Sequence, residues 1–230
     1  MTSHEQIYRN EAQAYEEMIS RQPDLAEEVR TIRDFAGLDV LDMGAGTGRL
    51  SGFLAREART LVCTDASQGM LDVLDAKLTA AGLPRNWTTL VADHRKLPLP
   101  DASVDLVVSG WSVCYLTDAS EPDWRRNLAV ILAEAERVLR PGGSIVLFET
   151  MGTGTETPNP PEFLLPYYEA LEAEYGFRHR WFRADYTFGS ADEAARRTAF
   201  FFGEGLAKKV EANGWATVPE CAGVWWRGRA

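Results

Sequence analysis

A short glycine-rich run constrains the fold of this chain more than any other feature of its sequence. Residues 44–48 read Gly-Ala-Gly-Thr-Gly and follow the apolar pair Val40 and Leu41. Glycine accepts positive φ angles and lets a ligand approach the backbone, and in open parallel sheets ligands bind beyond the carboxyl ends of the strands. The run therefore predicts a cofactor site at the end of the first strand of a parallel sheet.

Short apolar runs then recur along the chain with helical segments between them. The predicted strands cover residues 40–41, 61–63, 88–91, 104–108 and 144–148, and segments 181–188 and 217–226 are the sixth and seventh candidates. Apolar residues spaced by about 3.6 predict a helix over 128–139, which the Pro-Gly-Gly at 141–143 ends. This alternation is typical of a parallel sheet covered on both faces. We expect an α/β fold with a seven-stranded, mostly parallel sheet flanked by helices.

The length of 230 residues suits one domain with a substantial core. Within it we expect a helical cap over 1–35, a cofactor-binding core over 36–150, and a substrate-side part over 151–230. This last part holds a helical, aromatic insertion after the fifth strand, followed by the last strands. Tyr8, Ala12, Tyr15 and Ile19 share one face of a predicted N-terminal helix. Further on, Ser190 and Glu193 read as a capping box that opens a helix.

The charge balance bears on the class of substrate. The chain has 34 acidic and 24 basic residues and a formal charge of -10, which repels the phosphates of nucleic acids and anionic lipids. The one candidate basic patch gathers Arg178, His179, Arg180 and Arg183. Nucleic acid is therefore not the expected partner, and a small molecule is.

The cysteines and the apolar segments bear on the cellular compartment. Cys63, Cys114 and Cys221 are odd in number and widely spaced, which supports neither a disulfide framework nor a zinc site, so no metal is expected. We find no basic stretch followed by an apolar core at the N-terminus, and no apolar run of about 18 residues. These features predict a cytoplasmic protein without a membrane partner, and they leave the oligomeric state open.

The spacing of the glycines separates two cofactor classes. Dinucleotide-binding loops place glycines as G-x-G-x-x-G, and Arg49 occupies the sixth position here. Asp42, just before the loop, would repel a pyrophosphate but attract an ammonium or a sulfonium. Asp65 ends the second strand 21 positions after Gly44, where a carboxylate can accept from ribose hydroxyls. Taken alone, Asp65 would be interpreted as a helix cap. The combination favours a cationic adenosine cofactor.

These motifs resemble those of class I S-adenosylmethionine-dependent methyltransferases of the small-molecule type. The resemblance spans roughly residues 40–150 and rests on segments 40–48, 92–94 and 137–143, and on Asp65, Ser67 and Met70. It implies a Rossmann-like sheet, S-adenosylmethionine as the cofactor, and methyl transfer by in-line displacement to a small-molecule acceptor.

The resemblance also assigns roles to individual residues. The cofactor-binding residues that it implies are Asp42, Gly44, Ala45, Gly46, Asp65, Ala66, Met70, Asp93, His94, Ser109 and Gly110. By this assignment Asp65 holds the ribose and Asp93 accepts from the adenine amino group. Tyr8 or Tyr15 would cover the cofactor, with core packing as the equal alternative.

Methyl transfer from a sulfonium needs mainly alignment, and a base only where the acceptor atom holds a proton. His94 and Glu149 are the candidate proton acceptors, although packing against adenine and structural hydrogen bonding are their alternatives. Trp111, Tyr115, Tyr167 and Tyr168 are candidates for an aromatic acceptor pocket, although aromatic residues on helices also pack cores. A nucleophilic role for Cys114 has no support in its flanking residues.

Two other functions are compatible with such a cofactor loop. An aminopropyltransferase has a similar sheet, but it would need a paired acidic segment where residues 109–111 read Ser-Gly-Trp. A regulatory protein could keep the cofactor pocket without transferring the methyl group. The Asn-Pro-Pro-Tyr signature of many enzymes that methylate nucleobase or glutamine amines is absent after the fourth strand.

Overall fold

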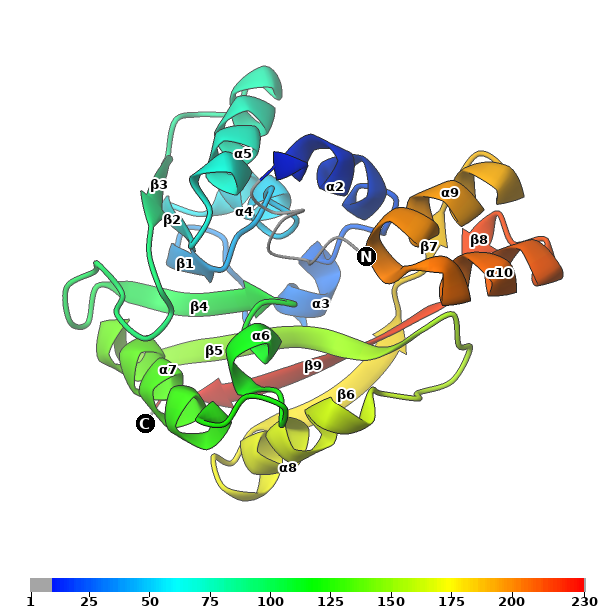
Figure 1. Cartoon of the computed structure of the whole chain (residues 1–230). Coiled ribbons are helices and arrows are strands. Elements are labelled where there is room, and N and C mark those ends of the chain that lie inside the picture. Colours follow the sequence, from blue (N-terminus) through cyan, green and yellow to red (C-terminus); the bar gives the residue numbers. More distant parts are fainter. Residues whose placement is uncertain (1–9, 230) are drawn as a thin grey trace.

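A seven-stranded sheet forms the centre of the computed structural model, which describes residues 10–229. The first four strands in chain order are β1 (Asp39–Met43), β2 (Thr60–Asp65), β3 (Trp87–Val91) and β4 (Val104–Gly110). The last three are β5 (Leu139–Thr153), β6 (Arg178–Arg183) and β9 (Glu220–Gly228). Their spatial order is β3-β2-β1-β4-β5-β9-β6 (Figure 1). The expected seven-stranded sheet is confirmed.

Neighbouring strands are parallel except at β9, which pairs antiparallel with both β5 and β6. From β1 the chain moves outward through β2 to β3 and then returns to β4 on the other side of β1. The carboxyl ends of β1 and β4 therefore flank the point where the strand order reverses. Ligands bind at this point in open α/β sheets.

Helices cover both faces of the sheet. The helices along the first half of the chain are α2 (Ala12–Ile19), α3 (Ala26–Arg30), α4 (Ser51–Glu57) and α5 (Gln68–Ala80). In the second half the chain forms α6 (Cys114–Thr117), α7 (Trp124–Val138), a short 3-10 turn η1 (Glu162–Leu164), α8 (Leu165–Ala173), α9 (Ala191–Phe202) and α10 (Glu204–Asn213). None of the helices within residues 10–229 is long and apolar enough to cross a membrane.

The core divides into two layers because side chains alternate between the faces of each strand. Leu41 and Met43 of β1 pack with α7 and α8, whereas Val40 packs with α3, α4 and α5. A third apolar cluster lies apart from these layers and joins α2, α9 and α10 to a two-stranded sheet of β7 (Tyr186–Thr187) and β8 (Thr217–Val218). We call the segment over residues 186–218, which holds β7, α9, α10 and β8, the α9–α10 unit; Figure 1 shows its two helices beside α2.

The last two predicted strands are each divided by a break that the sequence analysis did not anticipate. Residues 181–188 belong partly to β6 and partly to β7, because Ala184 and Asp185 leave the ladder between them. Pro219, which has no N–H, separates β8 from β9. The Asp185 carboxylate accepts from the Glu220 N–H at 3.0 Å across these breaks. The first break turns the chain from the large sheet into the α9–α10 unit, and the second returns it to the large sheet.

Other elements differ from the prediction mainly at their boundaries. The helix predicted over 128–139 begins earlier, at Trp124, and ends at Val138. The Pro-Gly-Gly at 141–143 lies within the first part of β5, with Gly142 at a φ of +76°. The predicted N-terminal helix is α2, which carries Ala12, Tyr15 and Ile19, and Tyr8 lies outside the described residues.

Candidate functional site

The glycine run forms the turn between β1 and α4, at the carboxyl edge of the sheet. Gly44, Gly46 and Gly48 have φ angles of +77°, +54° and +86°, a left-handed conformation that favours glycine. A Cβ at Gly44 would lie 2.0 Å from the Ser112 Oγ, and one at Gly48 would lie 3.0 Å from the Leu74 Cγ. These two glycines therefore let the loop pack closely on neighbouring parts of the chain.

Asp42 is buried beneath this loop. Its Oδ2 accepts from the Ser51 Oγ at 2.5 Å, which ties β1 to the first turn of α4. Its Oδ1 has no hydrogen-bond partner. Burial raises the pKa of Asp42 to about 7, and the hydrogen bonds from Ser51 oppose this shift. An orphaned carboxylate oxygen at this place fits the expected cationic end of a cofactor.

Asp65, at the end of β2, accepts hydrogen bonds from the backbone across the cleft. Its Oδ2 accepts from the Gly46 N–H at 2.9 Å and its Oδ1 from the Ser67 N–H at 2.8 Å. Burial raises the pKa of Asp65, while these amides and that of Ala66 stabilise the ionised form. Each carboxylate oxygen has a second lone pair, so both can still accept from ribose hydroxyls.

The remaining residues that the resemblance assigns to the cofactor lie around this loop. The buried Met70, in the first turn of α5, has its Cε 3.5 Å from the position of a Cβ at Gly46. Ser109 near the end of β4 donates to the Met43 carbonyl at 2.6 Å. Asp93 pairs with Arg95, with 2.6 Å between Oδ2 and Nη2, and this pairing lowers the pKa of Asp93.

His94 lies beside the loop as a neutral imidazole. Its Nε2 is 2.8 Å from the Ser112 Oγ, and its Nδ1 is buried without a hydrogen-bond partner. Burial lowers the pKa of His94 to about 4. The ring is therefore unprotonated near neutral pH, where it is free to accept a proton but is a weak base.

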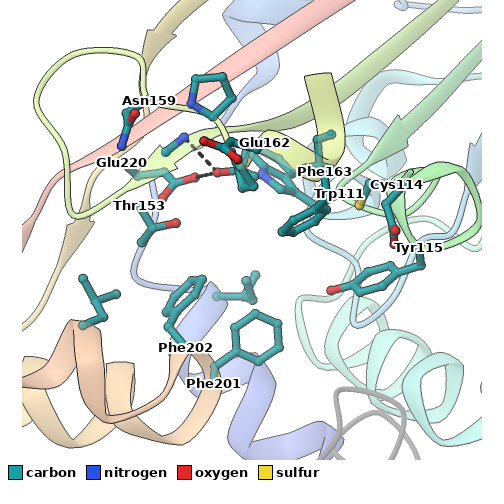
Figure 2. A pocket seen from close by; sticks show the side chains of 18 of the residues that line it. Trp111, Cys114, Tyr115, Thr153, Asn159, Glu162, Phe163, Phe201, Phe202 and Glu220 are labelled. Carbon is teal, nitrogen blue, oxygen red and sulfur yellow. Dashed lines mark hydrogen bonds between the residues drawn. The ribbon is translucent and has the colours of Figure 1, made fainter. Parts of the chain in front are cut away.

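A cavity of about 930 Å³ opens beside the cofactor loop. Arg49, next to the glycine run, and Trp111, next to the end of β4, both line it. Figure 2 shows the labelled wall: Trp111, Tyr115 and Phe163 lie on one side, and Phe201 and Phe202 of α9 face them. Such a volume with mostly apolar walls is typical of small-molecule sites.

Two of the four predicted pocket aromatics, Trp111 and Tyr115, line this cavity, whereas Tyr167 and Tyr168 lie in the core. The Tyr167 hydroxyl donates to the Glu149 Oε1 at 3.2 Å, and the Tyr168 hydroxyl donates to the Thr150 carbonyl at 2.7 Å. The Tyr168 ring stacks on Trp225 at a centroid distance of 4.4 Å. These contacts correspond to the core-packing alternative, because helix α8 turns both rings toward the sheet.

Glu149 lies behind the cavity wall. Its Oε1 also accepts from the Cys114 N–H at 3.2 Å, its Oε2 has no partner, and burial raises its pKa to about 7. Cys114 itself lines the cavity, and burial raises the pKa of its thiol, as expected for an unreactive cysteine.

Four charged residues of the cavity were missed from the sequence: Arg49, Asp118, Glu162 and Glu220. Arg49 lies in the wall with its Cζ 3.4 Å from the centroid of the Trp111 ring, and its Nε and Nη2 are buried without hydrogen-bond partners. Glu220 accepts from the Thr150 hydroxyl at 3.0 Å (Figure 2), and burial raises its pKa to about 7. A cation near the start of a helix, where the helix dipole disfavours it, was the available signal for Arg49.

The candidate basic patch lies on β6, at the edge of the sheet. The Arg180 guanidinium pairs with Glu28 at 2.5 Å, and Arg183 pairs with Asp185 at 2.8 Å. His179 stacks on Trp225 at 4.2 Å, and burial lowers its pKa. Acidic partners thus offset much of the positive charge.

Comparisons with known proteins agree with this geometry. Residues 41–147 match the family model described as a methyltransferase domain. A malonyl-[acyl-carrier protein] O-methyltransferase from Serratia marcescens is 31% identical over 145 residues, which cover 63% of this chain and 51% of that protein. A phosphoethanolamine N-methyltransferase 1 from Triticum aestivum is 29% identical over 158 residues, 64% of this chain and 30% of the relative. The matched part is about half of the Serratia protein and less of the wheat one.

The fold has counterparts among solved structures. The crystal structure of a SAM dependent methyltransferase from Aquifex aeolicus aligns with a TM-score of 0.57 and 21% identity. The alignment covers 87% of this chain and 88% of that one. At this identity the likeness concerns the arrangement of the sheet and its helices.

Proposed function

We propose that this protein, whose residues 41–147 are a class I S-adenosylmethionine-dependent methyltransferase domain, transfers a methyl group from that cofactor to a small-molecule acceptor by in-line displacement. One observation carries the proposal: a cavity of about 930 Å³ adjoins the glycine loop at the carboxyl edge of the sheet. A cofactor on the loop and an acceptor in the cavity would meet there.

The residues around the loop fit such a cofactor. Asp65 would hold the ribose, and the orphaned Oδ1 of Asp42 would face the positive end of the methionine part. Met70 would pack on the adenine, with Asp93 near its amino group. When bound, the cofactor supplies an electrophilic methyl group on a sulfonium.

The contribution of the chain is then mainly alignment and exclusion of water. Trp111, Tyr115, Phe163, Phe201 and Phe202 are among the aromatic residues that line the cavity. A dry, aromatic wall favours the loss of positive charge at the sulfur during methyl transfer. Proton acceptance by His94 or Glu149 stays a prediction. It is needed only for an acceptor atom that holds its proton near neutral pH.

Titration calorimetry with S-adenosylmethionine and S-adenosylhomocysteine tests the cofactor, and a screen with labelled methyl groups over fractionated metabolites tests transfer. We expect micromolar binding of both compounds and label in a small molecule. Failure of both compounds to bind would overturn the proposal. Binding without label in any fraction would favour the regulatory alternative.

A further inference from the structure

Arg49 is a half-buried cation whose charge the described part of the chain leaves without an ion-pair partner. No carboxylate of residues 10–229 lies within 4.0 Å of its guanidinium, and its Nε and Nη2 donate to nothing. Taking guanidinium nitrogens out of water without giving them a partner carries an energetic cost. A group that is kept at this cost and that faces a cavity is suited to bind an anion.

The surroundings hold the guanidinium in place. Its Cζ lies 3.4 Å from the centroid of the Trp111 ring, and that ring stacks on Phe148 with an interplanar angle of 14°. Trp111 has a φ of +51°, a strained conformation for a bulky residue, and its N–H donates to the Phe148 carbonyl at 2.7 Å. The strained backbone of Trp111 and its stacking on Phe148 thus hold the indole in place beneath the Arg49 guanidinium.

The charges around the cavity restrict the anion. Arg49 is the single cation among the described residues that line it, and Asp118, Glu162 and Glu220 are acidic. Three acids and one cation disfavour a dianion such as a phosphate monoester more strongly than a monoanion. A planar guanidinium fork instead suits one carboxylate, which it can bind through two parallel hydrogen bonds.

We propose that Arg49, stacked on Trp111, forms a carboxylate-binding subsite in this cavity, and that the acceptor is a monoanion with an apolar or aromatic body. The inference rests on the proposed function and narrows its substrate class. The body of the acceptor would pack on Phe163, Phe201 and Phe202, which line the same cavity. The methionine carboxylate of the cofactor is the other source of such an anion, but Gly44, Asp42 and Asp65 do not line the cavity, and Arg49 does.

The test compares 3-phenylpropanoate with its neutral isostere 3-phenylpropanamide by titration calorimetry, with and without saturating S-adenosylhomocysteine. We expect the wild-type protein to bind the carboxylate about tenfold or more tightly than the amide. Arg49→Gln should abolish this preference and leave the affinity for S-adenosylhomocysteine within about threefold. Arg49→Lys, which keeps the charge but not the fork, should restore part of the preference.

Arg85→Gln is the matched control, because Arg85 also lies over an indole, that of Trp87 at 4.8 Å, but is exposed and paired with Asp75. It should change neither affinity. Equal binding of carboxylate and amide by the wild type would overturn the subsite. A large loss of S-adenosylhomocysteine affinity in Arg49→Gln, with the carboxylate preference intact, would overturn it too and assign Arg49 to the cofactor. Failure of S-adenosylhomocysteine to bind the wild type would refute the proposed function alone. The comparison of 3-phenylpropanoate with 3-phenylpropanamide in the absence of S-adenosylhomocysteine would still test the role of Arg49.

Discussion

At Gly44 the backbone has a φ of +77°, and there is no room for a side chain, because a Cβ would lie 2.0 Å from the Ser112 Oγ. We expect Gly44→Ala to lower the free energy of unfolding by about 2–4 kcal/mol, through left-handed strain and overpacking, and to weaken S-adenosylhomocysteine binding by about tenfold or more. Urea denaturation and calorimetry measure the two effects.

Gly82 offers a matched control for this substitution. Its φ is +66°, but nothing lies within 4 Å of an added Cβ. Gly82→Ala should therefore show the strain alone, about 1–2 kcal/mol, with unchanged ligand affinity. Equal effects of the two variants would mean that the close approach of Ser112 to the loop has no role.

At Asp65 the carboxylate joins the glycine loop to the start of α5. The two oxygens of Asp65 accept from the Gly46 and Ser67 N–H groups. Asp65→Asn replaces one of these oxygens by an NH2 group, which cannot accept, and removes the negative charge. We expect S-adenosylhomocysteine to bind about 1–3 kcal/mol more weakly by calorimetry. Asp101→Asn, at an exposed position paired with Arg137, should leave binding unchanged. An unchanged affinity in a folded Asp65→Asn protein would remove Asp65 from the cofactor site.

The site residues that could be predicted lie close together in the sequence, whereas the role of those that were missed depends on contacts between distant segments. The glycines, Asp42 and Asp65 belong to one strand-helix-strand unit, so spacing alone placed them at one edge of the sheet. Arg49 was used only to exclude a dinucleotide, because its place in the cavity wall beside Trp111 and near Glu220 depends on segments that are distant in sequence. Glu220 similarly looked like one polar residue in a strand. No local pattern reports a missing ion-pair partner.

At the scale of elements, helix α9 supplies one wall of the cavity through Phe201 and Phe202. Its N-cap is Ser190, whose hydroxyl accepts from the Glu193 N–H at 3.1 Å, while the Glu193 carboxylate accepts from the Gly189 N–H at 2.9 Å. The predicted N-cap is present, but Glu193 bonds the N–H of Gly189, one residue before the N-cap, and not that of Ser190 as in a regular capping box. The wall of the cavity therefore depends on a cap more than ten residues away in sequence.

Removal of this cap tests the dependence. Ser190→Ala should lower the free energy of unfolding by about 1 kcal/mol, as loss of an N-cap does. It should weaken binding of 3-phenylpropanoate more than binding of S-adenosylhomocysteine, because α9 lines only the cavity. Ser20→Ala, at an exposed position after α2, is the control and should change stability by less than about 0.5 kcal/mol. Equal weakening of both ligands would contradict a local role for α9.

Element boundaries show what periodicity predicts and what it cannot. The five strands predicted up to residue 148 all exist, because each is marked by its own short apolar run. The two later segments read as continuous strands, yet each is divided. Pro219 was a visible breaker in the sequence, whereas the break at Asp185 depends on its hydrogen bond to Glu220, a tertiary contact.

For the whole molecule, three buried carboxyls set the dependence of stability on pH. Burial raises the pKa of Asp42, Glu149 and Glu220 to about 7 in each case. Their pKa values in the unfolded chain are near 4, so between about pH 4 and 7 the folded state binds more protons, and stability falls as pH rises. Asp39, whose pKa the Arg59 guanidinium lowers, has the opposite effect and loses its contribution only in acid. His94, whose pKa burial lowers to about 4, also opposes the three carboxyls, but between about pH 4 and 6.5 it offsets only one of them.

We therefore expect the ligand-free protein to be most stable near pH 5, with a melting temperature lower by at least about 5 °C at pH 8. Calorimetric scans between pH 4 and 9 measure this. Glu149→Gln should flatten the decline, since it removes one of the three groups and keeps an acceptor for the Cys114 N–H. A melting temperature that rises steadily to pH 8 would show that the pKa values of these carboxyls in the folded protein are not raised.

The α9–α10 unit enters and leaves the large sheet at the two breaks near Asp185 and Pro219, and its apolar cluster shares no residue with the layers that flank the glycine loop. Substitutions within the unit can therefore reshape one wall of the cavity without repacking the layers around the glycine loop. The same boundaries, near residues 185 and 219, are natural exchange points for chimeric proteins that carry a different segment in place of the α9–α10 unit.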